Sequence, residues 1–314
     1  MGVRHVRYPR QDDGLRRRTK GSRLGEVPLD VDFPGQIAAS KAAAGERPAR
    51  HAPELAEPAP AGGELTLEPP TWLGRVMRGL SFAVDATCRL RGGLWRLTPW
   101  RCRREAAGFA ALCDTTRFAT LREYPHLARA IEAEIRPHYE LYTSRFNAAW
   151  MAVSLELSVF LMALCRLLKP RRLVDLGSGF SSVLLRLYQR EAMPAPEVWS
   201  VDTSPEWLEM TRQILQWLDL PTDHLATWDD FVGQEPSGFD LVVHDLGSIL
   251  TRRRTLRRVL GFTARGGVVV IDDANYGKVR RHAKRTLRKR GIEHHLVGAA
   301  TRDKYGRYAL LAAL

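Results

Sequence analysis

The spacing of apolar residues changes near residue 170. Before it, apolar side chains recur at helical intervals, so that Leu127, Ile131 and Ile135 would share one helix face. After it, short runs rich in Val, Leu and Ile alternate with amphipathic spans of about 10–15 residues. Strands that alternate with helices predict βαβ units around a parallel sheet.

Seven apolar runs beyond residue 170 predict strands. In chain order they read RLVDL, EVWSVD, HLATW, FDLVVHD, GGVVVIDD, EHHLVGAA and RYALLAAL. The last two are joined by TRDKYG, which leaves no room for a helix, so we expect them to pair antiparallel. The sequence therefore predicts a doubly wound, Rossmann-like α/β fold. It has a seven-stranded sheet with a terminal antiparallel hairpin, preceded by an N-terminal helical region.

Composition divides the chain into three parts. Residues 1–70 are basic, rich in Pro and Ala and poor in large apolar residues, so we expect a mostly disordered tail. Residues 71–150 are the helical region, on the substrate side, and residues 151–314 carry the sheet and its cofactor site. Residues 71–104 interleave Trp and Leu with eight arginines. This pattern fits a basic amphipathic element on a membrane or RNA, or a helical pair packed on the sheet domain, which we favour.

The charge balance suggests acidic partners. Lys and Arg number 48 against 35 Asp and Glu, a formal charge of +13. Two spans concentrate this charge, TRRRTLRR and KVRRHAKRTLRKR. In the second span, one apolar face turns the cations outward, and its residues are Tyr276, Val279, Ala283 and Leu287. Such helices predict either a surface for RNA or another anionic partner, or a solvated helix face without a partner.

Cysteine usage and hydropathy bear on the compartment. The four cysteines form no CxxC pair and no apolar signal segment follows the N terminus, so we expect a cytoplasmic protein. The longest apolar segment, residues 152–168, is interrupted by Glu156 and is shorter than the roughly 20 residues that span a bilayer. It predicts a buried helix, and we expect no transmembrane segment.

Candidate chemistry gathers where the predicted strands end. In a doubly wound sheet, ligands bind at the carboxyl ends of the strands, near the point where the strand order reverses. The side chains that the sequence places there are Asp175 to Ser182, Asp202, Trp228 to Asp230, His244, Asp245, Asp272 and Asp273. Each of the first five strands thus ends in an acidic residue or runs directly into one.

The turn after the first strand indicates the charge of the ligand. Gly177 and Gly179 let the backbone approach a ligand closely, as at a pyrophosphate site. Asp175, just ahead of this turn, would repel an anion, so we expect the turn to face a cation. S-adenosylmethionine carries both an ammonium and a sulfonium, and Asp202, 27 residues after Asp175, is placed for ribose hydroxyls. The alternative is a structural glycine turn capped by one of the two serines that follow it.

Residues 170–314 resemble the class I S-adenosylmethionine-dependent methyltransferases. VDLGSGFSS resembles that family's acid-x-Gly-x-Gly motif, WSVDTSPEWL its ribose-binding motif, and FDLVVHD and ARGGVVVIDD its fourth and fifth strands. The resemblance implies that the glycine loop holds the methionine part and that Asp202 holds the ribose. It also implies that Asp229 or Asp230 meets the adenine amino group, with Trp228 against the adenine ring. The cofactor-binding residues implied are Asp175, Gly177, Ser178, Gly179, Phe180, Ser181, Asp202, Thr203, Trp228, Asp229 and Asp245.

The residues after the fourth and fifth strands bear on the acceptor. HDLG and IDDAN resemble small-molecule O-methyltransferases in which acids at these places bind a divalent cation. By this resemblance Asp245, Asp272 and Asp273 are candidate metal ligands, with oxygen donors that suit Mg²⁺. Without a metal, His244 or Asp245 would act as the catalytic general base. We therefore expect a methyltransferase acting on a small-molecule acceptor, at a hydroxyl oxygen. The alternative is an RNA methyltransferase that holds its substrate on the basic helices.

Other classes fit less well. HDLG lacks the Asn/Asp-Pro-Pro-aromatic motif of nucleic-acid amino methyltransferases, and no cysteine lies beyond Cys165 to serve as a cytosine C5 nucleophile. A nicotinamide-dependent oxidoreductase predicts an apolar residue at Asp175 and a glycine at Ser182. A non-catalytic membrane-associated module would depend on residues 71–104.

Overall fold

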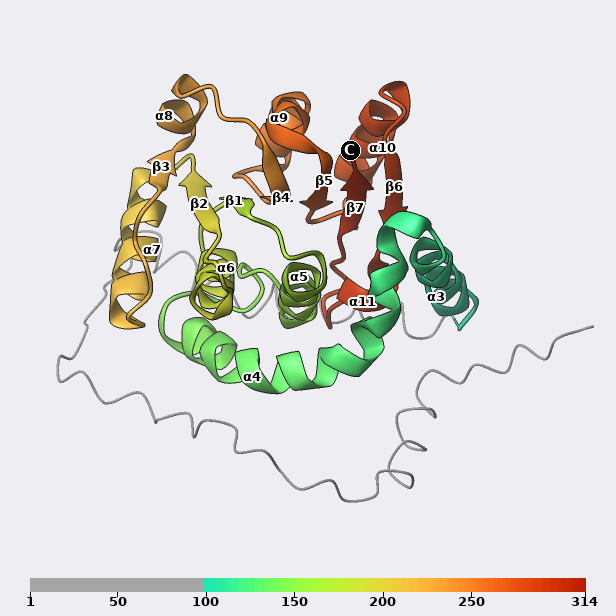
Figure 1. The fold of residues 1–314 in the computed structure, drawn as a ribbon, viewed down its shortest axis with the longest axis horizontal. Coiled ribbons are helices and arrows are strands. Elements are labelled where there is room, and N and C mark those ends of the chain that lie inside the picture. Colours follow the sequence, from blue (N-terminus) through green and yellow to red (C-terminus); the bar gives the residue numbers. More distant parts are fainter. Residues whose placement is uncertain (1–98) are drawn as a thin grey trace, which may run out of the picture. The chain divides into compact units, whose positions relative to one another are not determined.

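The computed structural model describes residues 99–314 (Figure 1). The tail predicted for residues 1–70 and the first part of the predicted helical region, residues 71–98, lie outside the described residues. The described part begins with four helices where helical spacing predicted them. These are α3 (Pro99–Cys113), the 3-10 helix η1 (Thr116–Glu123), α4 (Tyr124–Arg145) and α5 (Leu155–Leu168).

Helices α4 and α5 follow directly from the apolar pattern. Ile131 and Ile135 on α4 are fully buried, as their spacing predicts. Helix α5 begins where the side chain of Ser154 accepts a hydrogen bond from Leu157 N, and it ends at Lys169 in the left-handed conformation, ahead of a proline. No helix within residues 99–314 combines the length and apolarity needed to cross a bilayer.

The second half alternates strands and helices as predicted. The strands are β1 (Arg172–Leu176), β2 (Glu197–Asp202), β3 (Leu225–Thr227), β4 (Phe239–His244), β5 (Thr263–Ile271), β6 (Glu293–Leu296) and β7 (Leu310–Ala313). The helices between them are α6 (Phe180–Glu191), α7 (Pro205–Trp217), α8 (Trp228–Gly233), α9 (Ile249–Phe262), α10 (Gly277–Lys289) and α11 (Gly298–Thr301).

The sheet has the order β3-β2-β1-β4-β5-β7-β6. Its first five strands are parallel, and β7 pairs antiparallel with both β5 and β6. This confirms the doubly wound α/β sheet with a terminal antiparallel hairpin. One detail of the prediction was wrong: the four-residue helix α11 forms between β6 and β7, in a stretch that the sequence assigned to a strand.

Helices cover both faces of the sheet, which gives two apolar cores. Successive strand residues point to opposite faces: Leu173 packs into the core with α4, α5 and α6, whereas Val174 packs into the core with α9 and α10. Figure 1 shows these two groups of helices on opposite sides of the sheet. Because β1 and β4 are neighbours but lead to helices on opposite faces, the strand order reverses between them. A ligand site is expected at the carboxyl ends of these two strands.

The basic helix α10 packs as its pattern indicates, with one exception. Val279, Ala283 and Leu287 are buried. Tyr276, which we placed on the same face, is 41% exposed, because it precedes the helix in an extended conformation as its N-cap residue.

Candidate functional site

The glycine turn after β1 is fixed by a close backbone approach. Gly177 has φ of +110°, and a Cβ atom at this position would lie 2.5 Å from the carbonyl oxygen of Asp245. Its amide also donates to the carbonyl of Val201, at 2.8 Å. Only glycine fits this position, and the turn brings the ends of β1, β2 and β4 together.

Asp175 lies under this turn and is fully buried. Its Oδ2 accepts hydrogen bonds from Ser182 Oγ at 2.7 Å and Ser181 Oγ at 3.0 Å, whereas its Oδ1 has no hydrogen-bond partner. Burial raises the pKa of Asp175 to about 7, although the two serine hydrogen bonds oppose this shift. The serines therefore orient the carboxylate, but they leave one buried oxygen unsatisfied. Ser182 Oγ also accepts a hydrogen bond from Gly179 N, which is the capping role of the structural alternative.

Asp202, at the end of β2, holds the backbone of the same turn by a hydrogen bond. Its Oδ2 accepts from Ser178 N at 2.8 Å and its Oδ1 from Ser204 N at 3.0 Å. Burial also raises the pKa of Asp202 above its ordinary value. Two buried carboxylates thus flank the glycine turn, one from each of two adjacent strands. A carboxylate oxygen has more than one lone pair, so Asp202 can still accept from a further hydroxyl.

The remaining residues predicted for the cofactor differ in their exposure. Phe180 is buried and packs edge-on against Tyr139, so only its backbone borders the turn. Thr203 is exposed beside the turn that follows β4. Trp228 and Asp229 begin α8, where Trp228 is partly buried and Asp229 is exposed. Their neighbour Asp230 accepts from Thr227 Oγ1, so of the two acids Asp229 is the freer.

Tyr142 lies beside the glycine turn, although it is not among the residues predicted for the cofactor. Its ring is buried beside Phe180, and its hydroxyl lies 3.2 Å from where a Cβ atom of Gly179 would be. Burial raises the pKa of this phenol to about 12, so it stays protonated. A signal was present: Tyr142 follows Ile135 by seven residues, on the buried face of α4.

Three acids gather at the ends of β4 and β5, as expected, but an arginine lies among them. Arg252, in the first turn of α9, places Nη2 2.6 Å from Asp245 Oδ1 and Nη1 2.5 Å from Asp273 Oδ2. Asp245 Oδ1 has no hydrogen-bond partner, so its contact with Arg252 is an ion pair without hydrogen-bond geometry. Asp272 Oδ1 accepts a hydrogen bond from the amide of Asp273, at 2.6 Å.

This arrangement does not fit the divalent cation that the sequence suggested. Within residues 99–314, no group of three or more His, Cys, Asp or Glu side chains is arranged to hold a metal ion. The guanidinium of Arg252 contacts the oxygens of Asp245 and Asp273 that such an ion would need. The prediction of bound Mg²⁺ is therefore not supported.

The two candidate bases have different surroundings. His244 is fully buried and points toward α9, where its Nε2 lies 3.0 Å from the carbonyl oxygen of Arg252. Burial lowers the pKa of His244 to about 4. Asp245, in contrast, keeps 25% of its side chain exposed, and burial of the remainder raises its pKa well above the ordinary value. Of the two, only Asp245 can be reached from outside.

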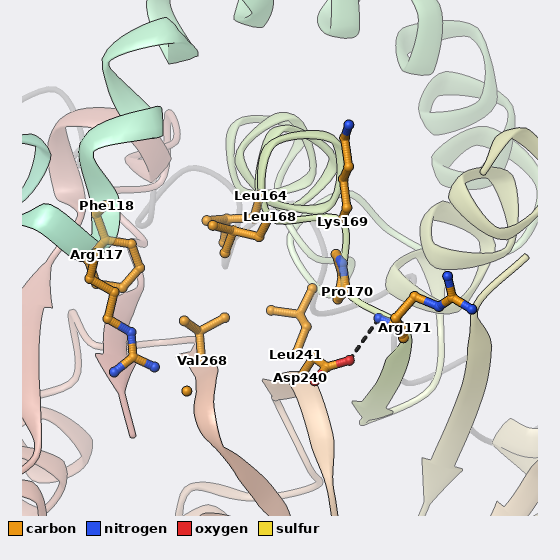
Figure 2. A pocket seen from close by; sticks show the side chains of 11 residues that line it. Arg117, Phe118, Leu164, Leu168, Lys169, Pro170, Arg171, Asp240, Leu241 and Val268 are labelled. Carbon is orange, nitrogen blue, oxygen red and sulfur yellow. Dashed lines mark hydrogen bonds between the residues drawn. The ribbon is translucent and has the colours of Figure 1, made fainter. Parts of the chain in front are cut away.

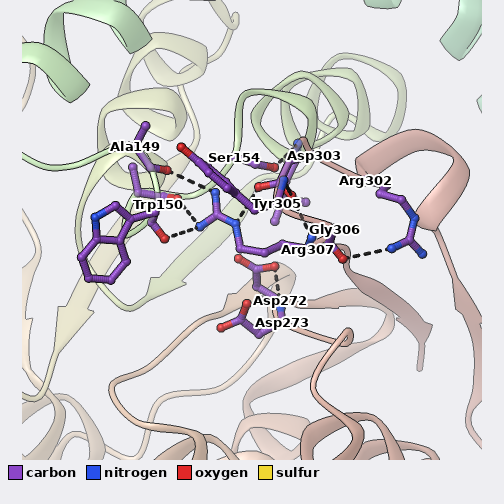
Figure 3. A network of polar contacts seen from close by, with 12 residues as sticks. Ala149, Trp150, Ser154, Asp272, Asp273, Arg302, Asp303, Tyr305, Gly306 and Arg307 are labelled. Carbon is purple, nitrogen blue, oxygen red and sulfur yellow. Dashed lines mark hydrogen bonds and ion pairs between the residues drawn. The ribbon is translucent and has the colours of Figure 1, made fainter. Parts of the chain in front are cut away.

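A second arginine anchors the loop between α4 and α5 at this end of the sheet (Figure 3). Arg307 donates to the carbonyl oxygens of Trp150 and Ala152, each at 2.9 Å, and pairs with Asp303 at 2.6 Å. It also lies close enough to Asp272 for each charge to favour the other's ionised form. The indole Nε1 of Trp150 is buried without a hydrogen-bond partner. The loop thus adds a candidate acceptor-binding segment from the helical region.

A cavity of about 290 Å³ lies at the opposite end of the sheet (Figure 2). It is lined by residues such as Arg117 on η1, Pro170 just before β1 and Asp240 at the start of β4. Because parallel sheets bind ligands at the carboxyl ends of their strands, this cavity is not the candidate active site.

Comparisons with known proteins give matches of fold only. No family model matches the sequence, and no match was found among curated proteins. A Bacillus cereus O-methyltransferase in complex with S-adenosylhomocysteine (SAH) shares 15% identity, covering 59% of this chain and 90% of that chain, at a TM-score of 0.44. The SAH-bound methyltransferase PaMTH1 of Podospora anserina shares 14% identity, covering 58% of this chain and 86% of that chain, at a TM-score of 0.45. The structure of TomG, an O-methyltransferase of Streptomyces achromogenes involved in tomaymycin synthesis, was solved in complex with S-adenosylmethionine. TomG shares 18% identity, covering 60% of this chain and 88% of that chain, at a TM-score of 0.43.

Proposed function

We propose that the chain is an S-adenosylmethionine-dependent methyltransferase that methylates a small-molecule acceptor at a hydroxyl oxygen. The observation that carries this proposal is the pair of buried carboxylates, Asp175 and Asp202, on either side of a glycine turn. The unsatisfied Oδ1 of Asp175 favours a cationic ligand and disfavours a pyrophosphate. Asp202 would accept from ribose hydroxyls.

The residues around the turn have distinct roles in this proposal. The backbone from Gly177 to Gly179 would hold the methionine part, and Asp229 with Trp228 would meet the adenine. When bound, the cofactor supplies a methyl group already activated by its sulfonium charge, so positioning contributes much of the catalysis. Asp245 would accept the proton of the acceptor hydroxyl, because it lies at the end of β4 beside the glycine turn and part of its side chain is exposed. His244 has no direct role.

Calorimetric titration of the purified protein with SAH tests the proposal, with NAD⁺ titrated in parallel. We expect saturable binding of SAH at one site and none of NAD⁺, because Asp175 would repel the pyrophosphate. A folded protein that binds NAD⁺ at the glycine turn, or that does not bind SAH, would contradict the proposal.

A second candidate, an RNA methyltransferase, is favoured by the surface of α9 and α10. The two helices pack against each other, and neither contains an acidic residue. Their exposed cations are Arg254, Arg257, Arg258, Lys278, Arg281, Arg285, Arg288 and Lys289. A face of this kind could neutralise several phosphates.

Charge reversal on this face separates the two candidates. If RNA is the substrate, Arg281→Glu with Arg285→Glu should weaken RNA binding about tenfold or more and flatten its dependence on salt. The matched control is Arg129→Glu with Arg145→Glu, two exposed residues of α4 on the other side of the sheet. Equal RNA binding by both double variants, measured by filter binding over a salt series, would remove the RNA candidate.

A further inference from the structure

The positively charged side chain of Arg252 lies between acidic residues at the carboxyl ends of β4 and β5. We infer that the guanidinium of Arg252 occupies the place of a divalent metal between Asp245 and Asp273, and that the site is therefore metal-independent. The inference rests on the proposed function only for the role of Asp245 toward an acceptor. The contacts themselves do not depend on any bound molecule.

The guanidinium of Arg252 and a divalent cation cannot occupy this place at the same time. The nitrogens of Arg252 lie 2.6 Å from Asp245 Oδ1 and 2.5 Å from Asp273 Oδ2. Magnesium and calcium need carboxylate oxygens at about 2.0–2.6 Å, so a bound ion would have to take over these same oxygens. It would also face the full positive charge of the arginine.

The position of Arg252 on its helix indicates that the acids hold it there. A cation in the first turn of a helix is unfavourable, because the N-terminal end of the helix dipole is positive. Arg252 is nevertheless only 11% exposed, and it donates a third contact to the carbonyl oxygen of Gly247, at 3.2 Å. Its own carbonyl oxygen meets His244 Nε2, which fixes the helix start against β4.

The local charges leave little room for a further dication. Three carboxylates face two arginines: Arg252 pairs with Asp245 and Asp273, and Arg307 lies near Asp272. Removing Arg252 would leave three carboxylates against one arginine. The oxygens of Asp245 and Asp273 that Arg252 now contacts would then be free, and a small rearrangement of these side chains would let them bind one Mg²⁺ or Mn²⁺ ion. In this proposal Arg252 is a positioning residue, because its ion pair holds the side chain of Asp245 in place.

Metal binding in the absence of cofactor tests the inference. Mn²⁺ is titrated into the full chain and followed by electron paramagnetic resonance, and Mg²⁺ binding is followed by calorimetry. We expect no stoichiometric binding by the unaltered protein and one acquired site in Arg252→Ala, with affinity at least tenfold higher. Arg254→Ala, an exposed neighbour on the same helix, should behave like the unaltered protein. Adding Asp273→Asn to Arg252→Ala should abolish the acquired site.

Two results would overturn the inference. One is stoichiometric Mn²⁺ binding by the unaltered protein that Asp245→Asn removes. The other is a folded Arg252→Ala protein, confirmed by circular dichroism, that binds no Mn²⁺. If Arg252→Ala does not fold, Arg252→Gln provides the same test with a side chain of more similar length. Because SAH binding is measured separately, failure here leaves the proposed cofactor site unaffected, and failure of SAH binding leaves the metal result unaffected.

Discussion

Replacing Asp175 by Asn is expected to weaken binding of S-adenosylmethionine about a hundredfold. A unit charge about 5 Å from a cationic ligand, at an effective dielectric constant of about 20, contributes roughly 3 kcal/mol. Each 1.36 kcal/mol corresponds to roughly a tenfold change in affinity. Asparagine keeps the shape of Asp175 and one oxygen for Ser182, but it removes the charge. Isothermal titration calorimetry at pH 8 measures the effect.

The same substitution should remove a dependence of affinity on pH. In the free folded protein, burial raises the pKa of Asp175 to about 7, so the carboxyl group is mostly protonated below that pH. A cationic ligand favours the ionised form, and its affinity should therefore rise between about pH 5.5 and 7 and level off above it. In Asp175→Asn the affinity should be nearly constant over this range.

Ser181→Ala is the matched control for Asp175→Asn. It removes one hydrogen bond to Asp175 and leaves the charge in place. We expect a loss of affinity below about tenfold, because the charge of Asp175 stays in place and Ser182 still donates to the same oxygen. If Asp175→Asn binds S-adenosylmethionine as tightly as Ser181→Ala does, the charge of Asp175 does not select the ligand.

The sheet could be predicted from the sequence because its signals are local. Runs such as RLVDL and GGVVVIDD are short, rich in Val, Leu or Ile, and each is followed by a turn or helix signal. The rule that parallel strands bind ligands at their carboxyl ends then placed Asp175, Asp202 and Asp245 at one edge without further information. The short helix α11 was missed because its Gly-Ala-Ala sequence adjoins a strand and has no polar side chain to cap it.

The arginines were harder to predict because their partners are distant in sequence. TRRRTLRR reads as a basic surface, and charge alone does not tell which arginine turns inward. The helical phase does: Arg252 precedes the buried Leu256 by four residues and Leu260 by eight, so it belongs to the inner face of α9. Its partner Asp273 lies 21 residues away, on another strand end. A single sequence shows on which face of its helix such a residue lies, but it does not show which residues it contacts.

Arg307 provides the second large expected effect, on stability. We expect Arg307→Met to lower the free energy of unfolding by about 3–5 kcal/mol, as when one partner of a buried ion pair is removed. The change leaves the carboxylate of Asp303, 3% exposed, without its guanidinium partner. It also leaves the carbonyl oxygens of Trp150 and Ala152 without their donor. Urea unfolding followed by circular dichroism measures the difference.

Arg136→Met is the control for Arg307→Met, because Arg136 pairs with Glu132 and Glu140 on the exposed side of α4. Exposed pairs contribute about 0–1 kcal/mol, so this variant should unfold at nearly the same urea concentration as the unaltered protein. If both variants lose the same small amount, Arg307 does not anchor the loop. If the Arg307 prediction holds, adding Asp303→Asn should restore part of the stability, because the buried carboxylate would then be neutral.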